Sequence, residues 1–256
     1  MENKHQKVSI VGYGNVGSHL AEALCNAGIV ITHICTQNKV VCEDLPNTSF
    51  VTDLQVLPIG QLTLICVHDG EIENILSSIS IETPVVYTSG SVKLDTLSRT
   101  DHLGVFYPLQ TFTKGIPVDI TKVPFFIESN SEAFGEELYA LASSLSSNVK
   151  YATSEERAKL HLAAVWVNNF TNHINFIAKD YLDGQQLDFE DLKPLLKETI
   201  RKIEMNSPFE VQTGPARRGD KRTIEQHLKM LEPKRQEIYQ LLSESILNTY
   251  KKNDKL

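Results

Sequence analysis

A glycine-rich segment near the start of the chain has the residue types and spacing needed to bind phosphate groups. It follows the apolar run Val8-Ser9-Ile10-Val11 and reads Gly12-Tyr13-Gly14-Asn15-Val16-Gly17, which is G-x-G-x-x-G. In such a segment the first glycine permits a tight turn, the second lets the backbone approach a pyrophosphate, and the third lets a helix pack closely on the preceding strand. The start of that helix adds backbone amides and the positive end of its dipole. The segment predicts a dinucleotide-binding loop; a tight turn that binds nothing is the plainer alternative.

The residues after the second expected strand bear on the choice of dinucleotide. NAD-binding proteins usually have an acid about 20 residues beyond the glycines, where it binds the ribose 2′-OH. This strand instead ends Cys35-Thr36-Gln37-Asn38-Lys39, and Glu43 and Asp44 come several residues later. Neutral polar groups beside a lysine tolerate a 2′-phosphate better than a carboxylate would, although the arginine often found in NADP sites is missing too. We expect Thr36 and Gln37 to contact the cofactor, and we favour NADP(H) over NAD(H).

Three more segments follow apolar runs, at the positions where ligands bind in an open parallel sheet. They are Val67-His68-Asp69, Ser89-Gly90-Ser91 and Tyr107-Pro108-Leu109-Gln110. We expect Val67, His68, Ser89 and Gly90 to contact the cofactor, with residues 89–91 shaping the nicotinamide pocket. His68 can serve as an acid or base near neutral pH, but an exposed loop histidine is the favoured interpretation. No neighbouring histidine and no G-x-S-x-G elbow supports a hydrolase.

A long segment after residue 153 places polar side chains on an otherwise apolar helix. His161, Asn168 and Asn172 are spaced i, i+7 and i+11, which puts them on one face of an α-helix. Polar side chains there cost free energy unless they find partners. One interpretation makes this face the border of the cofactor cleft, with His161 as proton donor and Asn168 orienting a substrate carbonyl or imine. The other gives these side chains hydrogen bonds to neighbouring helices or to a dimer partner.

A second polar group, Arg217-Arg218-Gly219-Asp220, lies in a segment rich in Gly, Pro and Arg. Arg218 can bind a substrate carboxylate through two parallel hydrogen bonds. An ion pair between Arg218 and Asp220 within the loop is the plainer interpretation, and we favour it. The histidines of the chain lack the spacing of metal ligands, so we expect no metal site.

The elements that must position these residues form a doubly wound α/β domain over residues 1–153. Short apolar runs without strict alternation are typical of parallel strands covered on both faces by helices. The expected strands are residues 7–11, 30–36, 49–53, 62–67, 84–89, 103–109, 124–128 and 148–153, and the expected helices are residues 14–26 and 131–145.

Residues 154–256 are expected to form an all-helical second domain. Thr153 is a candidate N-cap, and Glu155 and Glu156 favour a helix start. One long helix should run from there to about residue 183, because no proline or glycine interrupts it. Further helices are expected at residues 189–205, 223–231 and 233–251, with residues 214–222 as a loop.

Composition excludes several classes of function. The chain has 256 residues and a net charge of −7, which argues against sequence-independent binding of nucleic acid. No apolar run reaches the about 18 residues needed to span a bilayer, and the first residues lack the pattern of a signal peptide. Cys25, Cys35, Cys42 and Cys66 form no C-x-x-C pair and are expected to be buried thiols. We therefore expect a cytoplasmic protein with no membrane or nucleic-acid partner.

Motifs spread over nearly the whole chain give it a family resemblance. Besides the glycine loop these are residues 87–91, 104–112, 161–170 and 213–228, the last containing Thr213-Gly214-Pro215, Arg218-Gly219-Asp220 and His227-Leu228. With them the chain resembles Rossmann-like proteins with a C-terminal DUF2520 domain, described as NADP oxidoreductases and related to pyrroline-5-carboxylate reductase and 6-phosphogluconate dehydrogenase. The resemblance implies a helical domain of the 6-phosphogluconate dehydrogenase C-terminal type and a homodimer formed through it.

One departure from that wider superfamily affects the expected function. Many of its members have a catalytic lysine four residues before an asparagine on the first long helix, whereas Ala164 and Val165 precede Asn168 and Asn169 by four residues here. The lysine chemistry is therefore not carried over. We expect an NADP-dependent oxidoreductase that transfers a hydride to or from a small carbonyl, imine or hydroxy acid. The alternative is a dinucleotide-binding sensor or interaction protein without catalysis.

Overall fold

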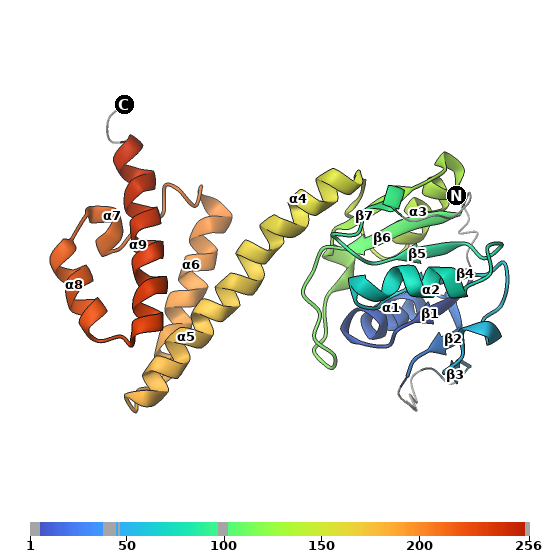
Figure 1. Ribbon diagram of the computed structural model, residues 1–256, viewed down its shortest axis with the longest axis horizontal. Coiled ribbons are helices and arrows are strands. Elements are labelled where there is room, and N and C mark those ends of the chain that lie inside the picture. Colours follow the sequence, from blue (N-terminus) through green and yellow to red (C-terminus); the bar gives the residue numbers. More distant parts are fainter. Residues whose placement is uncertain (1–5, 38–44, 46, 97–101, 254–256) are drawn as a thin grey trace. The chain divides into compact units, whose positions relative to one another are not determined.

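The computed structural model of the chain describes residues 6–37, 45, 47–96 and 102–253 (Figure 1). It divides into two compact units, Met1–Asn175 and Phe176–Leu256. The α/β part ends with its last strand at Tyr151, and every later element is helical. The compact division thus falls inside the long helix, about 20 residues after the predicted boundary at residue 153. The assignment of residues 154–175 to one functional domain or the other stays a prediction.

The first unit is built on an eight-stranded sheet with the order β3-β2-β1-β4-β5-β6-β7-β8. All neighbouring strands are parallel except β6 and β7. The order reverses between β1 and β4, which is the switch point at which doubly wound folds bind ligands. The strands are β1 (Lys7–Val11), β2 (Val30–Cys35), β3 (Ser49–Val51), β4 (Leu62–Ile65), β5 (Val85–Tyr87), β6 (Leu103–Pro108), β7 (Phe125–Ser129) and β8 (Val149–Tyr151). The predicted doubly wound, mainly parallel sheet is confirmed.

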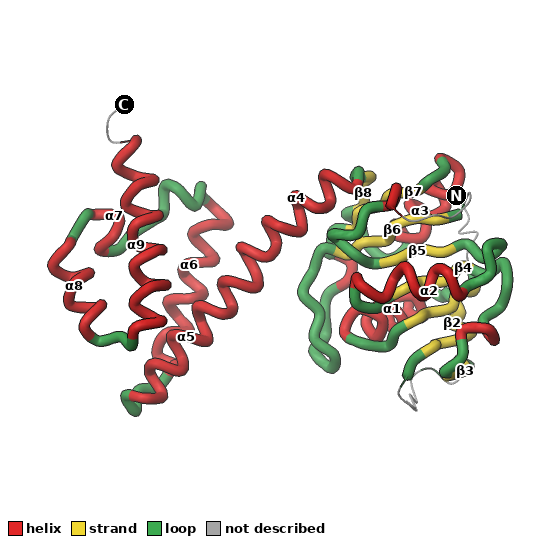
Figure 2. The backbone as a smooth tube through the Cα atoms, viewed as in Figure 1, coloured by secondary structure: helices red, strands yellow, loops and turns green. Residues whose placement is uncertain are grey.

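Helices cover both faces of this sheet (Figure 2). Helices α1 (Asn15–Asn26) and α3 (Glu132–Ser143) contribute Leu20, Leu24, Phe134 and Leu138 to the core on one face. The short helix α2 (Ile72–Ser78) contributes Ile72 and Leu76 to the core on the other face. Strands buried on both sides need continuous apolar runs, which is why β4 and β5 are buried along their whole length. Sequence reasoning missed α2, because seven residues are too few for a clear helical period.

The long helix begins at Thr153 as predicted. The Thr153 side chain accepts from the Glu156 amide, and the Glu156 side chain accepts from the Thr153 amide, forming a capping box. The helix runs as α4 (Ser154–Ala164), a π-helical segment η5 (Val165–Phe170) and α5 (Thr171–Gly184). The π-helical segment was not predicted; it widens the helix in mid-course and is often found at functional sites.

The second unit contains α6 (Lys193–Met205), α7 (Pro215–Arg218), α8 (Lys221–Lys229) and α9 (Pro233–Asn253). The expectation of a loop over residues 214–222 is wrong, because Pro215 occupies the first turn of α7 and Asp220 caps α8. Proline is well suited to a helix start because its fixed φ suits the first turn. No helix within the described residues is both long and apolar enough to cross a membrane.

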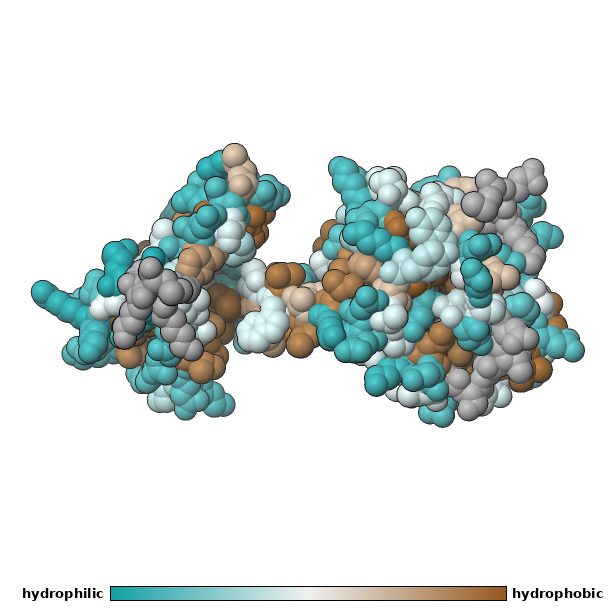
Figure 3. All heavy atoms as spheres, turned by 90° about the horizontal axis from the view of Figure 1, so that it is seen from above, coloured by the Kyte–Doolittle hydropathy of each residue, from teal (hydrophilic) through white to brown (hydrophobic). Residues whose placement is uncertain are grey.

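Large apolar side chains remain exposed along the helical region. On η5 and α5 they include Trp166, Val167 and Phe170, and on α9 they include Leu241, which is 70% exposed. Figure 3 shows hydrophobic residues in brown on the surface of the segment that joins α4 and α5. Exposed apolar surface of this extent is typical of an interaction face.

Candidate active site

The glycine loop joins β1 to α1 and is held by close backbone packing. Gly12 has a φ of +94°, and a Cβ atom there would lie 2.4 Å from the Cys66 carbonyl oxygen. A Cβ atom on Gly17 would lie 2.0 Å from the carbonyl oxygen of Gly12. Both positions therefore require glycine for the fold itself, as the spacing of the motif predicts.

Gly14 differs from the other two glycines, because no protein atom lies within 4 Å of a Cβ built there. Gly14 is the N-cap of α1, no side chain caps this end, and the first turn has no acidic residue. The start of a helix without a capping side chain leaves backbone amides for an external acceptor. The open side of Gly14, together with the amides of the first turn at Asn15, Val16 and Gly17, therefore fits a phosphate group.

The connection between β6 and β7 packs against this loop, which the sequence did not reveal. The Lys114 amide donates to Asn15 Oδ1 at 3.0 Å, and the Lys114 ammonium donates to the Tyr13 carbonyl at 3.3 Å. That ammonium also lies 4.6 Å from the centre of the Tyr13 ring. His19 Nε2 lies 2.8 Å from the Ile116 carbonyl oxygen, so α1 holds the connection at two places.

The predicted contacts at the end of β2 lie on the same edge of the sheet. The Thr36 amide donates to the Val51 carbonyl at 2.9 Å, and Gln37 is exposed. Beside them the Tyr13 ring contacts Phe50 edge-on, with 5.6 Å between ring centres. Lys39, Glu43 and Asp44, which bear on the choice between NAD and NADP, lie outside the described residues.

Tyr107 and His161 meet at the carboxyl end of β6. The Tyr107 hydroxyl lies 3.0 Å from His161 Nδ1, and Tyr107 is buried while His161 is half-buried. Burial raises the pKa of Tyr107 to about 12, Arg157 lowers it and Asp69 raises it. The phenol therefore stays protonated at neutral pH and can donate to Nδ1, which leaves the proton of a neutral imidazole on Nε2.

Gly90, from the turn after β5, closes tightly over this pair. A Cβ atom on Gly90 would lie 2.7 Å from Tyr107 Cζ and 2.8 Å from His161 Nδ1. The structure thus brings together residues from three of the predicted segments, at residues 89–91, 107–110 and 161–170. Sequence reasoning treated them separately, because the distance along the chain hides this contact.

The neighbouring serines form hydrogen bonds within and beside their own turn. Ser89 Oγ accepts from the amides of Ser91 and Val92 at 3.1 and 3.0 Å. The Ser91 hydroxyl donates to the Asp69 carboxylate. His68 precedes a short 3₁₀ helix, and within the described residues its imidazole makes no hydrogen bond. His68 is exposed, in agreement with the favoured interpretation of an exposed loop histidine.

The helix face expected to carry His161, Asn168 and Asn172 is interrupted. The π-helical segment Val165–Phe170 lies between His161 and Asn172 and contains Asn168. Because a π-helix has more residues per turn than an α-helix, spacings of seven and eleven residues no longer return to the same face. Asn168 is half-buried and Asn172 is exposed. The catalytic role of Asn168 stays a prediction, and its premise of one shared face does not hold.

Two of the four cysteines predicted to be buried thiols are buried in the structure. Cys35 and Cys66 are buried, and Cys25 is half-buried. Burial raises the pKa of Cys66 to about 12, with a smaller opposite effect from the Thr88 side chain. A thiol this hard to ionise is a poor nucleophile. Cys42 lies outside the described residues.

Residues 123–246 match the family described as Domain of unknown function (DUF2520). A candidate NADP oxidoreductase, BF3122 from Bacteroides fragilis, is 36% identical, with 94% of this chain and 98% of that chain covered and a TM-score of 0.87. The chain belongs to the DUF2520 family. No protein with curated function matches it.

More distant structures share the fold of this DUF2520 protein. An imine reductase from Myxococcus stipitatus in complex with NADP⁺ is 12% identical, with 97% of this chain and 94% of that chain covered and a TM-score of 0.66. A pyrroline carboxylate reductase from Plasmodium falciparum with NADP bound is also 12% identical, with coverages of 94% and 99% and a TM-score of 0.60. The family match begins just before β7, so it includes the Tyr107 partner His161 but not the glycine loop.

In the segment that contains Arg218 and Asp220, the contacts differ from the expected ion pair. Among the described residues no ion pair joins Arg218 and Asp220, so the favoured interpretation is wrong. The Asp220 carboxylate instead caps α8, where it accepts from the Thr223 amide at 3.1 Å and from the Thr223 hydroxyl at 2.7 Å. Hydrogen bonds from Thr223 hold the pKa of Asp220 below its usual range, and Arg218 adds a weaker effect.

Proposed function

We propose that this DUF2520 protein is an NADP(H)-dependent oxidoreductase that transfers a hydride to or from a small carbonyl, imine or hydroxy-acid substrate. The proposal is supported by the glycine loop, which is open at Gly14, and by the Tyr107–His161 pair at the same edge of one sheet. The loop follows β1, the turn with Gly90 follows β5, and Tyr107 is the last residue but one of β6. The NADP-bound reductases with the same fold support this choice of cofactor.

The proposed cofactor site uses the open side of the glycine loop for the pyrophosphate. Residues 12–17 supply backbone amides, and Thr36 and Gln37 at the end of β2 lie near the adenosine ribose. Val67, His68, Ser89 and Gly90 then surround the nicotinamide. This arrangement follows the general rule that a dinucleotide crosses the crevice outside the carboxyl ends of the strands.

We also assign Lys114 to the cofactor's phosphates. Its ammonium lies against the Tyr13 carbonyl of the glycine loop, and it forms no ion pair with a carboxylate in the described parts of the chain. An ammonium beside a phosphate-binding loop gains a strong charge-assisted hydrogen bond when an anion binds there. Lys114 thus supplies a positive charge at a site where sequence reasoning found only Lys39.

The chain's own residues orient the substrate and move a proton, while bound nicotinamide supplies hydride chemistry. His161 gives the proton in its imidazolium form: Nδ1–H donates to the Tyr107 hydroxyl oxygen, and the Nε2 proton passes to the nitrogen or oxygen of the reduced substrate, which leaves a neutral imidazole. The Tyr107 hydroxyl orients the ring. Asn168, on the π-helical segment, is proposed to orient the substrate carbonyl or imine.

Because the superfamily lysine is missing, we keep a second candidate function, a dinucleotide-binding sensor or interaction protein without catalysis. At the positions four residues before Asn168 and Asn169 stand Ala164 and Val165, neither of which can exchange a proton. A sensor or interaction protein would bind the cofactor without consuming it. Multiple-turnover assays with NADPH and panels of imines, keto acids and ketones separate the two functions. Sustained loss of nicotinamide absorbance supports the reductase, whereas tight binding without turnover on any panel supports the sensor.

The exposed apolar side chains of the helical region support a homodimer. Trp166 and Val167 are 61% and 74% exposed in the single chain, and Leu241 is 70% exposed. We propose that a second copy covers these side chains, and that the protein works in the cytoplasm, where buried free thiols are stable.

A further inference from the structure

Arg157 is a charged side chain in the interior of the first unit. It lies in α4, its side chain is 1% exposed, and it is one turn before His161. Residues four apart on an α-helix share a face, so Arg157 and His161 point the same way. A buried guanidinium costs much free energy unless each of its donors finds an acceptor.

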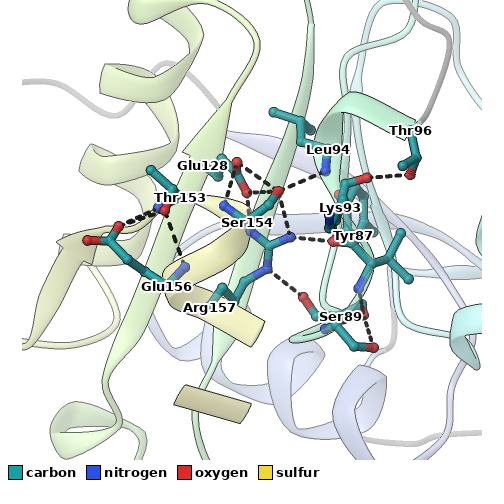
Figure 4. Close-up of polar contacts among 12 residues, drawn as sticks. Tyr87, Ser89, Lys93, Leu94, Thr96, Glu128, Thr153, Ser154, Glu156 and Arg157 are labelled. Atoms are coloured by element: carbon teal, nitrogen blue, oxygen red, sulfur yellow. Dashed lines mark hydrogen bonds and ion pairs between the residues drawn. The ribbon is translucent and has the colours of Figure 1, made fainter. Parts of the chain in front are cut away.

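Every side of this guanidinium has an acceptor (Figure 4). One terminal nitrogen donates to the Glu128 carboxylate from β7. Nε donates to the Ser89 carbonyl at 3.1 Å, and the other terminal nitrogen donates to the Val92 carbonyl. Arg157 therefore binds both ends of the turn formed by residues 89–92.

Glu128 is held in turn by the start of α4. Its carboxylate accepts from the Ser154 amide at 2.8 Å and from the Ser154 hydroxyl at 2.9 Å. The Ser154 hydroxyl also accepts from the Leu94 amide at 2.9 Å. The pair thus links β7, α4 and the segment after β5 into one polar cluster.

The turn that Arg157 holds is the one that closes over the Tyr–His pair. Gly90 lies between the two bonded carbonyls, and it has no spare room against Tyr107 and His161. Since α4 carries both Arg157 and His161, the same helix places the imidazole and fixes the turn opposite it. The cation of Arg157 also opposes the effect of burial on the pKa of Tyr107.

We propose that Arg157, with Glu128, is a positioning residue of the reaction: the pair fixes residues 89–92 against Tyr107 and His161 and so sets where the nicotinamide rests. This inference rests on the proposed function. A buried ion pair is often no more stabilising than apolar packing, so its value here is the placement of the turn. Only a planar group with donors on several sides can bind Glu128 and two carbonyls together.

The test compares Arg157→Lys and Arg157→Met with a control, Lys159→Met, on the same helix. Lys159 is 71% exposed, and within the described parts of the chain its one ion pair is with Glu155. The probes are adenosine 2′,5′-bisphosphate, which reports the adenosine half of the site, and NADPH, whose fluorescence reports the nicotinamide. We expect both Arg157 variants to keep their affinity for the bisphosphate. Their fluorescence change on binding NADPH should be lost, and turnover should fall by about 100-fold, the cost of a small misplacement.

Each other outcome has a definite meaning. Folded Arg157 variants with wild-type turnover and wild-type NADPH fluorescence overturn the inference alone. A wild-type protein that binds no NADPH overturns the proposed function and the inference with it. If both Arg157 variants fail to fold while Lys159→Met folds, the pair serves stability, and the positioning role is contradicted. Parallel losses of bisphosphate affinity and turnover in the variants also contradict it.

Discussion

The contact between Tyr107 and His161 couples a buried phenol to a half-buried imidazole. Burial disfavours the phenolate, so the proton stays on Tyr107 and directs the tautomer of its partner. A histidine oriented by a second group is a common arrangement for acid–base catalysis. The chemistry proposed for this protein therefore depends on two side chains that lie 54 residues apart in sequence.

Replacement of His161 tests the proton donor. His161→Ala should lower turnover by about 10²- to 10⁴-fold, because general acid catalysis contributes that much, with little change in NADPH affinity. The rate of multiple turnover and a fluorescence titration measure the two effects. His173→Ala, on the same long helix, is the control. Unchanged turnover in His161→Ala, or an equal loss in the control, would contradict the assignment.

The raised pKa of Tyr107 makes a prediction about alkaline stability. The unfolded phenol ionises near pH 10 and the folded phenol near 12, so its contribution is complete below pH 10 and is lost as pH rises towards 12. Between these values wild type should lose about 2 to 3 kcal/mol of unfolding free energy more than Tyr107→Phe. Urea denaturation across this pH range measures the difference. Equal losses in the two proteins would mean that Tyr107 titrates normally.

At the scale of elements, the β1–α1 junction and the β6–β7 connection form the proposed phosphate site together. Two glycines are needed for packing, and the third leaves an open side beside the uncapped helix start. The connection adds a cation that the glycine motif lacks. Gly12 and Gly17 are therefore needed for folding, whereas Gly14 and Lys114 are available for binding.

Gly14→Val tests the open side of the loop. No protein atom lies within 4 Å of the added Cβ, so the melting temperature should change little, whereas NADPH binding should be lost. Gly184→Val, at the end of α5 with equally open surroundings, is the matched control. Calorimetry and fluorescence titration give the two quantities. Wild-type affinity in Gly14→Val would remove the phosphate-loop assignment.

Lys114→Met tests the proposed phosphate contact of the β6–β7 connection. Loss of one charge-assisted hydrogen bond should weaken NADPH binding by about 10- to 100-fold. Lys122→Met, in the same connection but paired with Asp119 and 83% exposed, should bind as wild type does. The salt dependence of binding should also weaken in Lys114→Met alone. Equal affinities for the two variants would exclude Lys114 from the site.

At the scale of the whole molecule, the exposed apolar side chains of η5 and α9 are the basis of the proposed homodimer. A homodimer should have a mass near twice 28.7 kDa in analytical ultracentrifugation. Val167→Asp and Leu241→Asp should shift the measured mass towards that of the monomer, because a buried carboxylate without a partner opposes association. Ile59→Asp, on an equally exposed apolar residue of the α/β unit, should remain dimeric. A wild-type monomer would contradict the proposed assembly.

Much of the fold could be predicted because its signals are local. Each of the eight strands is a short apolar run, and the glycine loop and the capping box at Thr153 are motifs of fixed spacing. The π-helical segment and α2 lack such a signal. The site was only partly predictable, because the Arg157 cluster and the Lys114 contacts join residues that are far apart in sequence. Nothing in the sequence around Arg157 indicates its burial, because its partners Ser89, Val92 and Glu128 lie 29 or more residues away.

Titration of the purified protein with NADPH and NADH, followed by nicotinamide fluorescence, tests whether the glycine loop binds a nicotinamide dinucleotide. We expect saturable binding of NADPH, tighter than that of NADH, and loss of binding in Gly14→Val. Failure of the wild-type protein to bind either dinucleotide would contradict the assignment of the glycine loop. An interaction protein would then be favoured over a reductase.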